Sequence, residues 1–421
     1  MKLAPSTNVA WVSITLSITL GCAFSAAEPP AEFGADSPMD ITVSQAAATE
    51  LLVENERAEK LKDTGRSSQH VLNGTQGAGD PVDRLSYGVG SWDANSLGNH
   101  RVVIDVSTGT SVVAVHIPWR RRDHDPRDKG TILIDAKTGR RIDNVYAIEI
   151  NREFGDFVFE PITVPGTCYM YYMPYEMTGR NYPQTSYMKS EQTADEQWLR
   201  SLGYRNGKLS KENWSILPRA KVVEMQSIDE FNSFYPMEVI ATAAEVRRLQ
   251  SNAPNASYLL FPEDREHPIR MTEDLPLRWI EAGPRERFHA DALRGEFYAF
   301  QVGLYAFGKA IRDIDIGFGD LQGPNGFVIH ASAWRCFNVG GVDWRGREFE
   351  RTCPVEKGKV RALWFGIDIP KDAPAGRYRG RITIAPRDAE STPVQVDLDV
   401  KDLSLIHISE PTRPLYSSYA V

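Results

Sequence analysis

Two stretches of the chain alternate apolar and polar residues with a period of two, the pattern of strands that bury one face. The first stretch begins at Leu85, and residues that favour turns, such as Thr108-Gly109 and Pro165-Gly166, separate its short runs. These runs are Arg101–Val106, Ser111–Trp119, Gly130–Ala136, Asn144–Ile150, Phe157–Val164 and Cys168–Tyr175. Strands spaced in this way predict a β-sandwich or jelly roll over residues 85–217.

The second stretch, residues 273–402, shows the alternation more clearly. Ile314, Ile316 and Phe318 share one face of a strand, and the intervening acidic residues lie on the other. Further runs of this kind are Phe297–Phe307, Leu363–Ile369, Tyr378–Ile384 and Val394–Val400. One buried and one solvated face is typical of antiparallel sheets, so we predict a second β-sandwich here.

Residues 218–272, between the two stretches, favour a helix. Thr242 followed by Glu245 is a capping-box pattern, and Pro254 ends the amphipathic segment that follows it. The predicted fold class is therefore all-β, with two antiparallel β-sandwich or jelly-roll-like domains joined by a short helical connector. The sequence nowhere alternates strands with helices as a (β/α) barrel requires.

The start of the chain carries export signals. Residues 1–27 are typical of a secretory signal peptide, because Lys2 precedes the apolar run Val9–Leu20 and small residues follow it. Cys22 lies in a sequence that approaches a bacterial lipobox, so lipid anchoring there is the alternative to cleavage near Ala27. Residues 28–82 are polar, as in a linker. We expect an exported protein, periplasmic or extracellular.

Residues 403–421 do not resemble part of a fold. Leu403–Arg413 reads LSLIHISEPTR, which matches codon for codon the translation of a transposase tagmentation adaptor, and Ser418–Val421 matches the next constant adaptor segment. We expect this segment to be read-through from a sequencing library. The natural chain is then expected to continue beyond Lys401 or Asp402.

Composition narrows the partners. The formal net charge of −8 argues against nucleic acid or an anionic membrane as partner, and no transmembrane span is predicted. No spacing of Cys and His resembles a zinc site and no phosphate loop is present, so neither metal nor cofactor is predicted. Cys336 and Cys353 flank a Gly-rich stretch, which leaves a disulfide or two buried free thiols as alternatives.

Several motifs resemble the N-terminal region of large exported proteins related to glycoside hydrolase family 123. They are Gly98–Arg101, His116–Asp123, Tyr171–Tyr175, Pro236–Val239, Phe261–Arg265, Gly295–Gln301 and Cys336–Asn338. The resemblance implies that a (β/α)₈ catalytic barrel follows the second sandwich. In that family the barrel removes β-linked N-acetylgalactosamine with an adjacent Asp-Glu pair. The chain ends before such residues, so no catalytic residue is assigned.

Two groups of side chains are candidates for carbohydrate contact or for docking of the downstream barrel. The first is Trp119, Arg120 and Arg122, at the end of a strand. The second surrounds a Gly-Gly turn and contains Trp334, Asn338, Asp343 and Trp344. Aromatic platforms beside polar groups are what sugar recognition needs. Trp279 and Trp364 lie in strand contexts and are expected in the core, and the Asp-Glu dipeptides at residues 195–196 and 229–230 are expected to be solvated charges.

Two functions follow as hypotheses. The first is the non-catalytic N-terminal region of a secreted glycosidase-like protein of the N-acetylhexosaminide class, truncated before its barrel, which meets glycan through the parent protein. The second is a carbohydrate-binding or cell-surface interaction protein without enzymatic activity.

Overall fold

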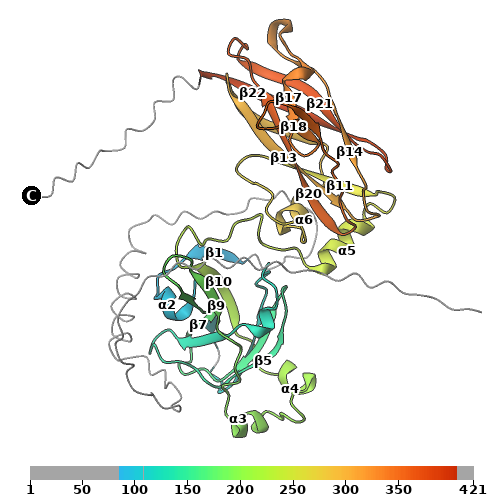
Figure 1. Ribbon diagram of the computed structural model, residues 1–421. Coiled ribbons are helices and arrows are strands. Elements are labelled where there is room, and N and C mark those ends of the chain that lie inside the picture. The colour runs from blue at the N-terminus through green and yellow to red at the C-terminus, as the bar shows by residue number, and fades with distance from the viewer. Residues whose placement is uncertain (1–84, 108, 405–421) are drawn as a thin grey trace, which may run out of the picture. The chain divides into compact units, whose positions relative to one another are not determined.

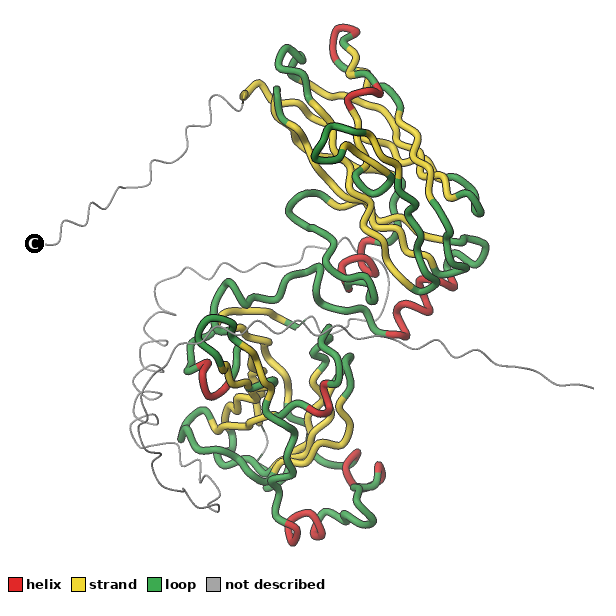
Figure 2. Tube along the Cα trace, viewed as in Figure 1, coloured by secondary structure: helices red, strands yellow, loops and turns green. Residues whose placement is uncertain are grey.

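The computed structural model describes residues 85–107 and 109–404 (Figures 1 and 2). The predicted signal peptide, the polar linker, Cys22 and residues 405–421 of the predicted read-through lie outside the described residues. Strands dominate and the helices are short, so the fold is all-β as predicted. In the described ranges no helix is long and apolar enough to cross a membrane.

The first β-domain, residues 85–228, contains a five-stranded and a three-stranded sheet. The five-stranded sheet has the order β1 (Ser86–Val89), β10 (Lys221–Ser227), β2 (His100–Val106), β7 (Gly166–Tyr172) and β4 (Thr131–Asp135). The other has the order β3 (Val113–Ile117), β6 (Gly155–Phe159) and β5 (Val145–Ile150). All pairs are antiparallel except β1 with β10.

The core of this domain lies between its two sheets and includes Val102, Ile104, Val115 and Phe157. Short helices and turns complete the domain: α2 (Ala94–Leu97), η1 (Pro126–Asp128), α3 (Glu196–Ser201) and α4 (Lys211–Ser215). Leu97 of α2 joins a smaller cluster with Trp92, and Trp198 and Trp214 pack with Ala114 and Val158. A two-stranded hairpin, β8 (Tyr175–Thr178) with β9 (Gln184–Tyr187), is also present.

The predicted helical connector is shorter than residues 218–272. Lys221–Ser227 forms β10 of the first domain, and Tyr258–Glu263 forms β11 of the second, so both ends of the predicted connector are strands. Between them lies α5 (Ala243–Ser251). Its capping box is confirmed, because Thr242 accepts from the amide of Glu245 and Glu245 accepts from the amide of Thr242.

The second β-domain is a sandwich of a four-stranded and a six-stranded sheet. The four-stranded sheet has the order β11, β13 (Phe297–Ala306), β20 (Lys359–Asp368) and β17 (Trp334–Cys336). The six-stranded sheet contains β12 (Arg287–Arg294), β22 (Thr392–Ser404), β21 (Gly376–Pro386), β15 (Leu321–Gln322) and β16 (Val328–Ile329), and β14 (Ile314–Phe318) pairs with β21. Only β12 with β22 is parallel. The hairpin β18 (Gly340–Val342) with β19 (Glu348–Glu350) and the turns η2 (Pro324–Gly326) and η3 (Ala331–Ala333) complete the domain.

Alternate residues of each strand point to opposite faces of the sheet, and this determines which side chains enter the core of the second domain. Phe300, Leu304, Leu363 and Phe365 point to the inner face of the four-stranded sheet and join one large cluster with Val394, Val396 and Leu398 of β22. The opposite, outer face of the same sheet is covered near β11 by α6 (Leu277–Ala282) and its neighbours, through Phe261, Trp279 and Tyr305.

Candidate functional site

The Trp119 loop is built into the first domain. Trp119 is 2% exposed, packs edge-on against Phe157, and donates its Nε1–H to the carbonyl of Asn151 at 2.8 Å. The guanidinium of Arg121 lies 4.7 Å from the Trp119 ring centroid and makes two 2.8 Å hydrogen bonds to Asp123. Burial alone would raise the pKa of Asp123, but the hydrogen bonds and positive charges of Arg121 and Lys129 together outweigh it, so the pKa is lowered.

The two arginines proposed to contact sugar hydroxyls are already paired. Arg120, whose φ is 46°, donates to both oxygens of Glu245 at 2.8 Å, so the capping-box carboxylate also binds a guanidinium. Arg122 lies 3.0 Å from Glu238. Trp119 is therefore core, and the structure does not bring these three side chains together as an exposed sugar platform.

The second group of candidates also divides. Trp334 is 1% exposed, stacks on Phe318 and donates to the carbonyl of Gly319. Asn338 uses its amide to join two strands, since Nδ2 donates to the carbonyl of Ala362 and Oδ1 accepts from the amide of Trp364. Both side chains therefore hold the fold and leave no polar group for a ligand.

Asp343 and Trp344 lie in the turn of the β18–β19 hairpin. Asp343 accepts from the amides of Arg345 and Arg347 and forms an ion pair with Arg347, so it shapes the turn. Trp344 is 85% exposed, with the Arg345 guanidinium 4.4 Å from its ring centroid. Of the four candidates in this group, Trp344 alone presents a ring to solvent.

The cysteines of the described ranges are buried free thiols. Cys336 and Cys353 belong to the core of the second domain and form no disulfide in the structure, which corresponds to the second alternative from the sequence. Burial raises the pKa of the Cys336 thiol to about 11 and that of the Cys168 thiol to about 12.

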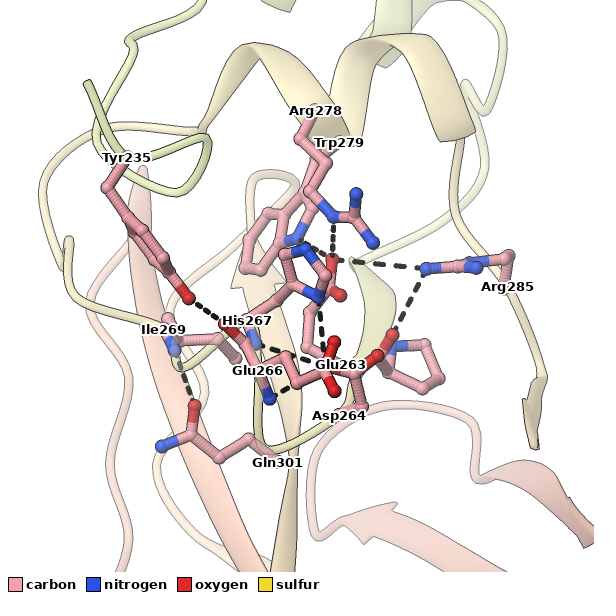
Figure 3. Close-up of polar contacts among 11 residues, drawn as sticks. Tyr235, Glu263, Asp264, Glu266, His267, Ile269, Arg278, Trp279, Arg285 and Gln301 are labelled. Carbon is pink, nitrogen blue, oxygen red and sulfur yellow. Dashed lines mark hydrogen bonds and ion pairs between the residues drawn. The ribbon is translucent and has the colours of Figure 1, made fainter. Parts of the chain in front are cut away.

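A buried carboxylate that the sequence did not single out organises the outer face of the four-stranded sheet (Figure 3). Glu263, at the end of β11, is 2% exposed and accepts from Trp279 Nε1 at 2.9 Å and from Arg278 Nε at 3.3 Å. Arg285 lies 3.9 Å from the same carboxylate and donates to the carbonyl of Pro262. These contacts satisfy the charge of Glu263 and tie α6 to β11.

The loop after β11 continues this polar cluster (Figure 3). Asp264 accepts from the amides of Glu266 and His267 and lies 2.9 Å from His267 Nδ1. Gln301 Oε1 accepts from the amide of Ile269, which holds the loop over β13. The Trp279 ring stacks on Phe261, and it sits above Gly303, where a Cβ atom would lie 2.3 Å from the ring.

Beyond Gln301 the outer face of this sheet is uncovered in the described residues. Phe297, Phe337 and Trp364 are 42%, 52% and 46% exposed, and we call these three residues the aromatic face. Phe297 lies over Gly366, and its ring centroid is 6.1 Å from that of Phe337. Phe337 donates its amide to the carbonyl of Trp364 on the neighbouring strand. The prediction that Trp364 is a core residue is therefore wrong. Trp279 is fully buried as predicted, although it lies in helix α6 and not in a strand.

The outer face of the six-stranded sheet is charged. Asp397 accepts from Arg287 at 2.7 Å, and Asp399 accepts from Arg377 at 2.9 Å and lies 3.3 Å from His289. The hydrogen bond from Arg377 lowers the pKa of Asp399. Next to these pairs lies an open hollow of about 730 Å³, which includes Glu286, Arg379, Arg381 and Gln395 in its lining.

The Asp-Glu dipeptides have structural roles. Asp195 caps α3 by accepting from the amide of Trp198, and Glu196 pairs with Arg200 one turn later. Asp229 accepts from the amide of Asn232. Within the described ranges no group of three or more His, Cys, Asp or Glu side chains could hold a metal ion.

Part of the chain matches a known protein family. Residues 90–228 match the family described as "Glycoside hydrolase 123, N-terminal domain". The matched range runs from just before α2 to just after β10, so it contains nearly all of the first β-domain. This part of the chain is therefore an N-terminal region related to glycoside hydrolase 123. No match to a curated protein was found.

Similar solved structures include a family 123 glycoside hydrolase from Clostridium perfringens, studied for glycolipid glycan hydrolysis. It is 17% identical, with a TM-score of 0.25, and the alignment covers 30% of this chain and 24% of that one. The chain thus spans about a quarter of that enzyme. A PapD-like domain of human CEP192 is 13% identical, with a TM-score of 0.21, over 28% of this chain and 84% of its own. A protein of unknown function from Porphyromonas gingivalis is 10% identical, with a TM-score of 0.19, over 75% and 88%.

Proposed function

We propose that the chain is the non-catalytic N-terminal region of an exported glycoside hydrolase-like protein, in whose parent a (β/α)₈ barrel follows and cleaves an N-acetylhexosaminide. The observation that carries the proposal is the match of residues 90–228 to the N-terminal domain of glycoside hydrolase 123. The two sandwiches would then hold and orient the barrel.

The contacts of the first domain support a scaffold role. Trp119, Arg121 and Asp123 form the kind of group that could bind a sugar, yet the indole is buried and the guanidinium is bound to the carboxylate. The hydrogen-bonding groups of these side chains are already paired within the protein, which leaves few of them for a ligand. We expect the isolated chain to fold and to hydrolyse nothing.

Two measurements test this function. Sequencing the natural reading frame beyond Lys401 should reveal a barrel with an Asp-Glu pair at a strand end, and a cell-wall anchor or repeat array there would refute the proposal. The purified chain should release no chromophore from a chromogenic N-acetylgalactosaminide, while the complete parent protein should do so. Turnover by the chain alone would mean that the active site lies within these residues.

Trp344 favours a second candidate function, a carbohydrate-binding protein without catalysis. An indole that is 85% exposed in a hairpin turn is a suitable platform for the C–H face of a sugar. Affinity electrophoresis in glycan-containing gels would compare the chain with Trp344→Ala and with Phe349→Ala, a control on β19 of the same hairpin. Retardation that only Trp344→Ala abolishes would favour binding, and equal mobility of all three would reject it.

A further inference from the structure

The aromatic face carries a further inference, which rests on the function proposed above. We propose that Phe297, Phe337 and Trp364 form a docking surface for the domain that follows β22 in the parent protein, and that this domain meets them with an apolar patch. Exposed aromatic clusters of this kind mark interaction sites, and interface centres are enriched in Phe, Trp and Arg.

The distribution of apolar side chains singles out this region. Within the described part of the second domain, all the large apolar side chains that are exposed belong to β13, β20 or the segment from Phe337 to the end of β19. They are Phe297, Phe337, Val342, Trp344, Phe349 and Trp364. On the same outer face, α6 and the Glu263 cluster cover the half nearer β11. The sheet therefore has a covered half and a bare half, and the bare half is aromatic.

The course of the chain points to the occupant. Near its end β22 pairs with β12, with Lys401 opposite Leu293, and the next residue of β12, Arg294, forms an ion pair with Asp402. Phe297 follows three residues after Arg294, across a turn at Gly295. The position from which any following domain departs is thus close to the edge of the aromatic face, so such a domain can reach it without a long linker.

Two charged side chains without an ion-pair partner in the described part of the chain lie next to the rings and would fix the orientation of a docked domain. Arg335 lies opposite Gly366 in the β17–β20 register, and its side chain donates only to the carbonyls of Ser332 and Trp334. Asp368 lies opposite Phe297 in the β13–β20 register. Within the described ranges neither forms an ion pair, whereas most arginines of the second domain do. A partner that presents an acid to Arg335 and a base to Asp368 would dock in one orientation only.

A glycan fits this surface less well than a protein does. The rings of Phe297 and Phe337 meet at 63°, so they do not form a flat platform for successive sugars. The neighbouring amide of Asn338 is bound to two backbone groups, and Gln301 is buried beneath the loop at Ile269. Sugar hydroxyls would therefore find few directed partners, and unpaired hydroxyls weaken binding.

Side-chain footprinting tests the proposal directly. The 421-residue chain and the complete parent protein would be labelled with a photo-activated carbene and analysed by peptide mass spectrometry. We expect the three rings to be labelled in the chain and protected several-fold in the parent, while Tyr182, which is 89% exposed in the first domain, serves as the internal reference. Equal labelling in both proteins would overturn the docking surface even if the parent proves to be a hydrolase.

Introducing a charge into the aromatic face tests whether these rings themselves form the interface or are only shielded by the rest of the parent protein. Phe337→Asp in the parent should restore labelling of Phe297 and Trp364, whereas Phe349→Asp, on the neighbouring hairpin, should leave their protection intact. Protection that survives Phe337→Asp would contradict the proposal. If added N-acetylgalactosamine protects the three rings of the isolated chain from labelling, and the rings are not protected in the parent, the surface binds a glycan and not a protein domain. A following domain that is not a barrel would refute the proposed function but leave this test in force.

Discussion

Trp279 donates its indole N–H to the buried carboxylate of Glu263 at 2.9 Å, which joins α6 to the end of β11. The indole is fully buried and the carboxylate is 2% exposed, so neither group can turn to water if its partner is removed. The pair therefore fixes where the cover of the four-stranded sheet ends and where its aromatic face begins.

Removing this carboxylate should destabilise the second domain. Glu263→Ala leaves the Trp279 N–H without an acceptor and takes the counter-charge from Arg278 and Arg285, so we expect a loss of about 2–4 kcal/mol in the free energy of unfolding. Urea denaturation followed by far-UV circular dichroism measures it. Glu281→Ala, an exposed position on the same helix, should change stability by less than about 0.5 kcal/mol. Similar losses for both variants would show that Glu263 has no special role.

The tryptophans should differ in their access to a quencher. Trp344 and Trp364 are 85% and 46% exposed, whereas Trp119, Trp279 and Trp334 are at most 2% exposed. Acrylamide should therefore quench the emission of Trp344 and Trp364 most strongly. The quenchable fraction of the total emission should be smaller in the double variant Trp344→Phe, Trp364→Phe than in the wild type. Trp279→Phe serves as the matched control and should leave the quenchable fraction unchanged. Because Trp198 and Trp214 are partly exposed, some quenching is expected to remain. A quenchable fraction as large in the double variant as in the wild type would contradict the exposure of Trp344 and Trp364.

The charged face of the six-stranded sheet should show in the pH dependence of stability. The pKa of Asp399 is lowered in the folded state, so its contribution is complete above its unfolded pKa, about 3.9, and is lost as the pH falls through the lower folded value. Asp399→Asn should therefore be less stable than the wild type at pH 7, and the difference should shrink below about pH 4. Denaturation across this range measures it, with Asp372→Asn as the unpaired control. A difference that is constant with pH would mean that the Arg377 pair contributes nothing.

The cysteines should be unreactive in the native protein. Because burial raises the pKa values of Cys168 and Cys336 to about 12 and about 11, neither thiol ionises appreciably at pH 8. Alkylation at that pH should label Cys168, Cys336 and Cys353 only after unfolding, with each assigned by peptide mass spectrometry. Recovery of a linked peptide pair containing Cys336 and Cys353 without reductant would establish the disulfide that the structure lacks.

Alternation predicted most of the strands because their two faces differ. β14, β20, β21 and β22 follow the sequence pattern closely, and the helix after Thr242 begins at its capping box. β11 was missed because all six of its residues are buried, which removes the alternation, and because Pro262 interrupts it. β10 was missed because a bulge between Val222 and Glu224 breaks its period.

The candidate site could be predicted only in part. Trp364 alternates with Leu363 and Phe365 on β20, so its side chain lies on the face opposite to theirs. We predicted it in the core because it lies in a strand, although the same alternation, applied to this position, would have placed it outside. Glu263 could not be found in this way, because its partners Arg278, Trp279 and Arg285 lie far along the chain and meet it only after folding. Whether a tryptophan is a core residue or a platform depends on such distant contacts.

Gly366 decides how flat the aromatic face can be. A Cβ atom at this position would come within 2.1 Å of the Phe297 ring, so the ring can lie down on the strand only because a hydrogen atom stands there. A methyl group at this position would force the Phe297 ring to turn away from the strand, so that it would project from the centre of the aromatic face. The shape of the aromatic face therefore depends on the absence of a side chain at Gly366. A single substitution at this position during evolution would be enough to remove or restore the fit between this face and a docked domain.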